Sequence, residues 1–599
     1  MTSAFTAHAG NETSKQQFQK IADEYFDQVY FPRRPTAGTT AGYHQYDTKL
    51  EDFSRKNIDA EVAALREFEK RVSAISATAL DKTTRGDREM VLGDIRSSLL
   101  TLETIRPWAK NADNYSGTCA NAAFTLIERK FASPDDRLRS LIAREKQMPS
   151  LLAQARVNLK NPPRIFTEIA IEQLPGILSF FERDVPLAFA DSHDRALKDE
   201  FKQTNASVIA ALKSYQAWLK TDLLPQSNGD FRIGAEVFSK KLKYDEMIDL
   251  PLDKLVEIGR ADMRRNQQQF SRVAKELEPD KDPSAVLEEL GHNHPTPNQL
   301  LDAFRATFDS LLGFIRSHHI VTVPSDVRPI VEETPPFMRA TTFASMDSPG
   351  PFETKATDSY FNVTLPDPSM TPAQVEGFMH SFNVGTVIST SIHEAYPGHY
   401  VQYLFSDQAP SRVRKVLNSN TNVEGWAHYT EQMMLDQGYG QPGVPTDRSS
   451  SVGWKSGVPT DRSSSVGLES GAGAKDAREA KFLRLGQLQD ALLRNARFIV
   501  GIQLHTGKIT LEQAVEFFQK EGYQSRETAQ VETKRGAGDP TYLYYTLGKI
   551  EIMKLRADLM KKQGAAFSLE EFHNNFLRQG FPPIKIVREA LLEDDSSAL

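Results

Sequence analysis

Apolar side chains recur at helical spacing along most of the chain. In the first such stripe they occupy positions i, i+3, i+4, i+7, i+8 and i+11, which form one face of an amphipathic helix. This stripe consists of Phe18, Ile21, Ala22, Tyr25, Phe26 and Val29. The same period runs through residues 60–75, 92–105, 206–219 and 255–277. Capping-box sequences at 510–513 and 568–571 mark two further helix starts. The pattern predicts a large, mainly α fold, and we expect a central cleft between its helices.

Strand-like sequences are few and short. Residues 320–323, 337–343 and 360–365 are rich in β-prone side chains and are separated by turn residues. These segments predict a small sheet, or extended loops, shortly before a helix-compatible stretch that begins with a capping box at 371–374 and runs to Tyr396.

The chain has one weak seam and one unusual repeat. The segment 225–243 separates an N-terminal helical region, 1–240, from a second helical region, 241–599, although one continuous domain is also compatible with the pattern. Residues 443–456 and 457–470 are two copies of one Gly/Ser/Pro-rich unit that differ only at two positions. Because this composition cannot bury a core, we expect a flexible surface insertion.

Composition and charge narrow the possible partners. The chain has 599 residues, is 39% hydrophobic and carries a net charge of −7. It has no apolar run long enough to span a membrane, and its mild acidity argues against nucleic acid as the main partner. The single cysteine, Cys119, excludes an intramolecular disulfide and a zinc site built from several cysteines. The first residues do not resemble a signal peptide, so we expect a cytoplasmic protein, and a secreted mature form stays compatible.

The helix-compatible stretch ends in a concentration of metal-binding side chains. Residues 393–399 read His-Glu-Ala-Tyr-Pro-Gly-His, and Glu424 follows 25 positions after His399. Zinc in hydrolases takes three ligands of these types and keeps one position for water. Glu394, next to the first histidine, is then placed to take a proton from that water.

The spacing of the two histidines requires a break in the helix. They are six positions apart, so an unbroken helix would rotate them by about 240° and aim them in different directions. Pro397 disrupts the helix and Gly398 permits unusual backbone angles. The chain can therefore bulge and bring His399 back beside His393.

A second predicted helix, 421–437, carries the third ligand. Glu424, His428 and Glu431 lie at i, i+4 and i+7 and share one face. We expect Glu424 to bind the metal and His428 to point into the same cavity. Glu431 is placed to orient a ligating histidine through its free ring nitrogen.

These residues resemble the family catalogued as domain of unknown function 885. The similarity is carried by the segments 393–402, 424–431, 485–494, 504–507 and 545–549. The family is usually described as containing candidate zinc metallopeptidases with a mostly helical fold. Its ligand arrangement is similar to that of thimet-oligopeptidase-type gluzincins, in which the histidines are four positions apart. The resemblance implies a tyrosine-rich segment that faces the reacting carbonyl, and its counterparts here are Tyr542, Tyr544 and Tyr545.

The predicted site assigns a role to each candidate residue. One zinc ion is bound by His393, His399 and Glu424, although manganese or cobalt also suits such ligands, and Glu394 is the general base. The candidate donors to the developing oxyanion are His428, His505 and Tyr545. The candidate substrate-binding residues are Tyr542, Arg339, Arg535 and Lys549.

Three functions remain open at this point. The first is a zinc-dependent peptidase that cleaves short peptides in a helical cleft. The second is a zinc hydrolase that acts on a non-peptide amide or ester metabolite. The third is a helical scaffold whose metal site is vestigial. The presence of Glu394, which is not a ligand, favours the first two functions, because a vestigial site has no need for a base.

Overall fold

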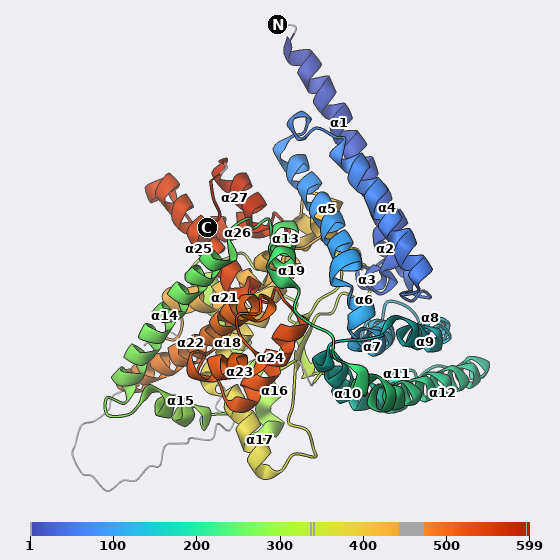
Figure 1. Ribbon diagram of the computed structural model, residues 1–599. Coiled ribbons are helices and arrows are strands. Elements are labelled where there is room, and N and C mark those ends of the chain that lie inside the picture. Colours follow the sequence, from blue (N-terminus) through green and yellow to red (C-terminus); the bar gives the residue numbers. More distant parts are fainter. Residues whose placement is uncertain (1–2, 336–337, 340–341, 442–471, 595) are drawn as a thin grey trace.

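The computed structural model describes residues 3–335, 338–339, 342–441, 472–594 and 596–599. The described chain is mainly α-helical, as the apolar periodicity predicts (Figure 1). None of its helices is both long and apolar enough to cross a membrane. The duplicated unit at 443–470 lies outside the described residues.

The first part of the chain forms a helical array in which α7 to α12 lie near one end of α4 and α5 (Figure 1). Its helices are α1 (Ser3–Tyr25), α2 (Phe31–Arg33), α3 (Pro35–Thr40), α4 (Arg55–Ser73), α5 (Lys82–Leu100), α6 (Pro107–Lys110), α7 (Asp113–Ile127), α8 (Pro134–Glu145), α9 (Met148–Asn158), α10 (Arg164–Ser179), α11 (Val185–Ala188) and α12 (Arg195–Trp218). The predicted helices at 60–75, 92–105 and 206–219 correspond to α4, to α5 with the following π turn, and to α12.

The second part of the chain forms a larger body (Figure 1). Its helices are α13 (Gly234–Glu246), α14 (Leu252–Leu277), α15 (Pro283–Gly291), α16 (Leu300–Ser317), α17 (Pro372–Met379), α18 (Val384–Glu394), α19 (His399–Leu404), α20 (Arg412–Val416), α21 (Asn420–Asp436), α22 (Ala472–His505), α23 (Leu511–Lys520), α24 (Arg526–Gly538), α25 (Tyr544–Gln563), α26 (Leu569–Leu577) and α27 (Ile584–Leu592). The predicted helix at 255–277 is α14, and the capping box predicted at 510–513 begins α23.

Buried apolar side chains gather in three clusters. One contains the stripe from Phe18 to Val29 together with side chains of α4 and α5, and it is completed by Val413, Leu417 and Ile586 from the second part of the chain. Another cluster lies between residues 50 and 223 and includes the fully buried Cys119, whose thiol pKa is raised by burial. The largest cluster draws almost entirely on residues after 230 and surrounds the elements that carry the candidate site.

The described strands form one small sheet in the order β1-β3-β2. Here β1 (Ile330–Glu333) runs parallel to β3 (Tyr360–Val363), and β2 (Ala344–Asp347) runs antiparallel to it. Of the predicted strands, 360–365 is confirmed by β3, whereas 337–343 falls partly outside the described residues and precedes β2. Residues 320–323 form no strand, so the alternative of an extended loop holds for them. Side chains of α26 bind the backbone there instead, since His573 contacts the Ile320 carbonyl and Asn574 accepts from the Thr322 N–H.

The helix-compatible stretch from 371 to Tyr396 is interrupted. The capping box of Thr371 and Gln374 begins α17, as predicted. A single 3-10 turn, η9 (His380–Phe382), then ends at Asn383. The Asn383 side chain accepts hydrogen bonds from the N–H groups of Gly385 and Thr386 and so caps a new helix, α18. The single predicted helix is therefore two helices, and the second one carries the metal-binding motif.

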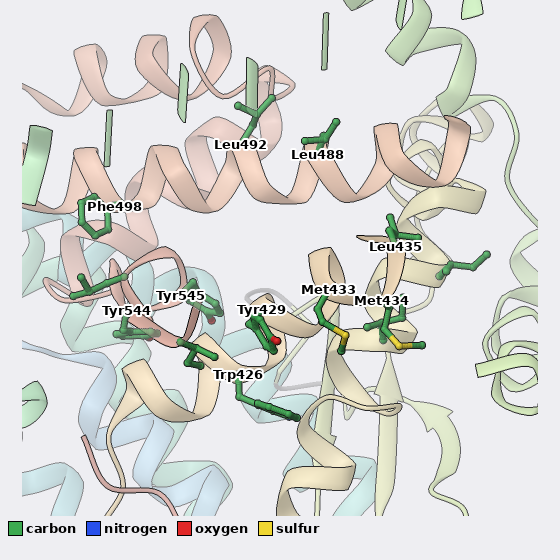
Figure 2. Close-up of a cluster of buried hydrophobic side chains, with 14 of the residues drawn as sticks. Trp426, Tyr429, Met433, Met434, Leu435, Leu488, Leu492, Phe498, Tyr544 and Tyr545 are labelled. Carbon is green, nitrogen blue, oxygen red and sulfur yellow. The ribbon is translucent and has the colours of Figure 1, made fainter. Parts of the chain in front are cut away.

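Two glycines set the distance between α21 and α25. A Cβ atom on Gly548 would lie 1.9 Å from the Thr421 carbonyl oxygen, and one on Gly425 would lie 2.5 Å from the Gly548 Cα. Larger side chains would therefore force the helices apart. Figure 2 shows Trp426 and Tyr429 of α21 near Tyr544 and Tyr545 of α25. Helix α22, which carries Leu488, Leu492 and Phe498, runs above them in this view. This close packing fixes the α21 ligand residue beside the tyrosines of α25.

The buried imidazole of His573 makes folding stability depend on pH. It is fully buried, and burial lowers its pKa to about 3, well below the roughly 6.5 of an exposed histidine. The unfolded chain therefore binds the additional proton first, and stability is lost as pH falls below 6.5. Between pH 7.5 and 5.5 we expect His573 to account for about 1.4 kcal/mol of lost unfolding free energy. Urea unfolding of the wild type and His573→Gln measures this difference, with the exposed His193→Gln as control. Equal pH dependence of the wild type and His573→Gln would contradict it.

Candidate metal centre

The loop between α18 and α19 brings the two motif histidines together. The Tyr396–Pro397 peptide bond is cis, and the Gly398 N–H donates to the Ile392 carbonyl oxygen at 3.0 Å. A Cβ atom at Gly398 would lie 1.8 Å from the His393 carbonyl oxygen, so this close return requires glycine. The ring centroids of His393 and His399 are 4.8 Å apart with their planes at 87°. The predicted bulge is confirmed.

Glu424 completes the cluster from α21. Its Oε2 lies 3.4 Å from Nε2 of His393 and 3.4 Å from Nε2 of His399. The three candidate ligand atoms all lie within 4.8 Å of one another. Two contacts hold α21 against the loop and α19. The Trp426 Nε1–H donates to the Pro397 carbonyl oxygen at 3.0 Å, and Gln402 donates to Asn422 at 2.9 Å.

The donor set fits a divalent transition metal. Ligands about 2.1 Å from a tetrahedral zinc ion stand roughly 3.4 Å from one another, which matches the two nitrogen–oxygen separations at Glu424. Burial raises the pKa of Glu424, but hydrogen bonds with both histidines outweigh it and hold that pKa well below its usual range. The carboxylate therefore stays ionised in a mostly buried place, where a cation is its natural partner.

Glu431 binds the ring nitrogen of His393 that faces away from Glu424. Its Oε1 accepts from Nδ1 of His393 at 2.6 Å, and its Oε2 accepts from Nδ1 of His428 at 3.1 Å. Arg494 of α22 forms an ion pair with the same carboxylate at 3.1 Å. Burial would raise the pKa of Glu431, but Arg494 and the two histidines hold it well below its usual range.

This support fixes which nitrogen of His393 faces the metal position. Because Nδ1 donates to the Glu431 carboxylate, the other ring nitrogen, Nε2, is the one directed toward Glu424 and His399. Burial disfavours the imidazolium of His393, yet the bonds with Glu424 and Glu431 raise its pKa to about 9. His428 lies behind Glu431 and is fully buried, and burial lowers its pKa to about 3. It thus reaches the cluster through Glu431.

Glu394 directly follows His393, and its carboxylate is uncommitted. It is the last residue of α18 and is 8% exposed. Within the described part of the chain, no hydrogen bond or ion pair holds its side chain. A nearly buried carboxylate without a partner is costly.

Tyr545 also borders the cluster. Its ring is stacked on that of His393 at a centroid distance of 6.4 Å. Arg535 of α24 donates to its hydroxyl oxygen at 3.0 Å, and Arg494 and Arg497 also lie over the ring. The hydroxyl can therefore donate its own hydrogen elsewhere, because its oxygen already accepts from a guanidinium.

Three of the other predicted residues are engaged inside the protein. Nε2 of His505 contacts the Gly536 carbonyl oxygen at 2.7 Å, and His505 lies eleven residues along α22 from Arg494, about 16 Å by helix rise. Tyr542 is fully buried against Gly501 and Gly536. The Lys549 ammonium is fully buried in an ion pair with Asp262 at 3.0 Å.

The last predicted residue, Arg339, lies near the small sheet. It pairs with Glu333 at 2.8 Å and donates to the Thr334 carbonyl oxygen. Among described residues, no hydrogen bond or ion pair connects Arg339, Tyr542, Lys549 or His505 with the three candidate ligands. Their predicted roles in substrate binding and catalysis stay predictions.

Arg494 has a position that the sequence analysis did not predict. The segment 485–504 is rich in apolar residues, and Arg494 and Arg497 lie one turn apart within it. Two arginines in such a helix need buried acidic partners, and these are Glu431 for Arg494 and Glu532 for Arg497. The presence of two arginines among many apolar residues could therefore have indicated buried ion pairs in this helix.

Replacing Glu431 with Gln should weaken metal binding. The amide cannot provide the charge that balances Arg494 and His393, and its orientation of His393 is weaker. Loss of such a supporting carboxylate typically costs about 10–100-fold in metal affinity. Competition with a fluorescent zinc chelator measures this change. Glu532→Gln, which disturbs a buried arginine pair that does not contact His393, is the matched control, and equal affinities for the two variants would contradict the assigned role.

Comparisons with known proteins agree with the fold. No protein with a curated description matches the chain at a significant level. A solved structure from Shewanella oneidensis, described as a candidate lipoprotein of unknown function, is 25% identical, with a TM-score of 0.74 over 96% of this chain and 99% of that one. A candidate lipoprotein from Colwellia psychrerythraea is 18% identical, with a TM-score of 0.76 over 98% and 99% of the two chains.

A family model matches residues 35–456 and 463–591, so that the match is interrupted only inside the duplicated unit. These residues make up most of the chain and include the whole candidate metal centre. The chain therefore belongs to the family described as "Bacterial protein of unknown function (DUF885)".

Proposed function

We propose that this protein is a zinc-dependent hydrolase that cleaves the amide bonds of short peptides. The observation that carries the proposal is the convergence of His393, His399 and Glu424 within 4.8 Å, next to the uncommitted carboxylate of Glu394. The similarity of this ligand set to thimet-oligopeptidase-type enzymes supports the same reaction. A site that served only to hold the fold together would not need Glu394.

The protein side chains prepare the reaction. Zinc bound by the two histidines and Glu424 would supply a Lewis acid and lower the pKa of a water molecule toward about 7. Glu394 accepts the proton of the attacking water and then delivers it to the nitrogen of the leaving amine. Glu431 keeps His393 in the orientation that directs Nε2 to the metal position.

Tyr545 is the best-placed donor to the developing oxyanion. It borders His393, and its oxygen accepts from Arg535. A hydroxyl whose oxygen is bound by a guanidinium directs its own hydrogen to another acceptor, and such donors stabilise the charge that forms during amide hydrolysis. The analogous roles predicted for His428 and His505 receive no support from their buried positions.

Limited access to the centre favours small substrates. The side chains of His393, His399 and Glu424 are 7%, 8% and 23% exposed. A folded protein cannot present a peptide bond to ligands buried this deeply, whereas a short, flexible peptide can enter. We therefore expect peptides of a few residues to be better substrates than intact proteins.

Metal content and activity test the proposal together. The metal content is measured for the wild type and for His393→Ala, His399→Ala, Glu424→Ala and Glu394→Gln after dialysis against trace zinc. We expect each of the three ligand variants to lose about one zinc ion per chain and Glu394→Gln to keep it. A mixed library of short peptides then identifies a cleavable bond.

Each possible failure points to a different conclusion. Zinc retained in His399→Ala would mean that the ligand set is wrong. If the zinc-loaded protein hydrolyses non-peptide amides or esters but no peptide, the proposed substrate class is wrong and the protein is a hydrolase of such metabolites. No metal loss in any variant and no hydrolysis would leave a scaffold protein as the remaining function.

A further inference from the structure

A second group of histidines surrounds Glu376, away from the centre described above. His292 directly follows α15, and His294 lies in the loop after it. Glu376 belongs to α17, and His380 begins η9 one helical turn later. Three imidazoles therefore meet one carboxylate where the loop after α15 lies against α17 and η9.

The geometry of this group is close to that of the first centre. Oε1 of Glu376 lies 3.9 Å from Nδ1 of His292 and 3.8 Å from Nε2 of His380. One ligand atom from each of these three residues lies within 4.8 Å of the others. The rings of His292 and His380 are 4.3 Å apart and at 84°, much as the rings of His393 and His399 are.

His294 directs a third imidazole nitrogen to the same carboxylate oxygen. It is fully buried, and its Nδ1 lies 2.8 Å from the Pro295 carbonyl oxygen. Because that oxygen can only accept, Nδ1 carries the hydrogen, and the other ring nitrogen faces Oε1 of Glu376 at 3.1 Å. With a hydrogen on Nδ1, Nε2 and Oε1 are two acceptors 3.1 Å apart, and either a proton or a metal ion between or beside them resolves this contact. A ring held by a backbone carbonyl in this way is typical of metal-binding histidines.

His380 provides an independent indication. Its Nε2 is buried, and within the described part of the chain it has no hydrogen-bond partner. An unsatisfied ring nitrogen is unfavourable unless something absent from the polypeptide binds it. That nitrogen is directed to the same carboxylate oxygen as the nearest nitrogens of His292 and His294.

We propose that His292, Glu376 and His380 form a second divalent metal site, with His294 as a further ligand or as the residue that orients Glu376. Imidazole and carboxylate ligands suit zinc best among common metals. The side chains of His292 and Glu376 are 45% and 39% exposed, so the ion can exchange with solvent. The site is separate from the proposed hydrolytic centre and does not depend on it.

A metal ion at this site would stabilise the start of α18, the helix that carries His393 of the first centre. The Asn293 carbonyl oxygen, between His292 and His294, accepts from the N–H of Val384, the first residue of α18. The same helix carries His393 in its last turn. A metal ion that ties the loop after α15 to α17 therefore fixes the start of the helix whose end holds the first metal ion. We assign it a structural role that stabilises the fold.

Metal titration of the full chain tests the inference. The protein is stripped with a chelator, titrated with zinc and desalted, and bound zinc is measured by elemental analysis. We expect about two zinc ions per chain for the wild type and about one for the double variant His292→Ala/His380→Ala. Glu376→Gln preserves the shape of the side chain and should also lose one ion. It therefore tests the site even if the double alanine variant misfolds. The exposed His193→Ala is the control and should bind like the wild type.

The two proposed sites can be separated in the same experiment. His393→Ala should lose the ion of the first centre and keep the ion of the second. Zinc should therefore still raise the melting temperature of His393→Ala, but not that of the double variant His393→Ala/His380→Ala. The inference is overturned if zinc binding and the zinc-dependent rise in melting temperature are the same with and without the substitutions at 292, 376 and 380. Loss of zinc in those variants alone, with none lost in His393→Ala, would support this site and reject the proposed function.

Discussion

Replacing Glu394 with Gln should abolish most hydrolysis while leaving the metal in place. The carboxylate has no partner in the described part of the chain, so the amide can occupy the same space without breaking a contact. Removal of a general base lowers kcat by about 10²–10⁴-fold. Because Glu394 is not a ligand, the zinc content and melting temperature should match those of the wild type.

This result distinguishes catalysis from structure. The measurement is kcat for the best peptide from the library, at equal zinc loading, for Glu394→Gln and for the wild type. Glu333→Gln is a suitable control because its carboxylate is solvent-accessible and pairs with Arg339 near the sheet. A Glu394→Gln enzyme with wild-type kcat would reject the proposed base, and one with reduced zinc would place Glu394 among the ligands.

Replacing Lys549 with Met should strongly destabilise the fold. The Lys549 ammonium and the Asp262 carboxylate are both buried and 3.0 Å apart. Burial raises the pKa of Asp262, but Lys549 and Asn495 outweigh burial and hold it well below its usual range. Removal of one partner from a buried ion pair typically costs about 3–5 kcal/mol, because the other charge stays buried.

A nearby lysine on the same helix provides the control. Lys554 pairs with Asp558 at 2.7 Å, but both side chains are about one third exposed, and such a pair contributes at most about 1 kcal/mol. Urea unfolding should therefore separate Lys549→Met clearly from Lys554→Met. If Lys549 instead binds a substrate carboxylate, the substitution should raise KM and leave unfolding unchanged, which would contradict the structural role.

The grouping of the candidate ligands could be predicted because its information is local in sequence. The spacing of His393 and His399 with Pro397 and Gly398 between them was enough to predict a bulge, and the i, i+7 spacing of Glu424 and Glu431 put both on one helix face. The contact between Glu431 and His393 then followed from the need to orient a ligand. Within the described residues these parts agree with the structure.

Residues whose environment depends on distant segments were harder to place. Lys549 lies four positions from Tyr545, and the pattern of α25 does not reveal that its ammonium faces Asp262 on α14 rather than solvent. The same is true of residues 320–323, which read as a strand but are bound by His573 and Asn574 from α26. In each case the decisive partner comes from more than 200 residues away.

The break before α18 is intermediate between these cases. Asn383 is a strong capping residue, but no proline interrupts residues 373–396, so nothing in this stretch alone excludes a continuous helix. The backbone turns there because Asn293 accepts from Val384, a contact that brings in the loop after α15. The histidine group around Glu376 escaped the sequence analysis for the same reason.

The burial of Cys119 makes the protein convenient for site-specific labelling. The only thiol in the chain is fully enclosed by helices of the N-terminal part and resists ionisation, so maleimide reagents should leave the native wild type unmodified. A single cysteine introduced at an exposed position can then carry one dye without removing any natural residue beforehand. Pairs of such positions would allow fluorescence transfer to report how the two helical parts move when metal or peptide is added.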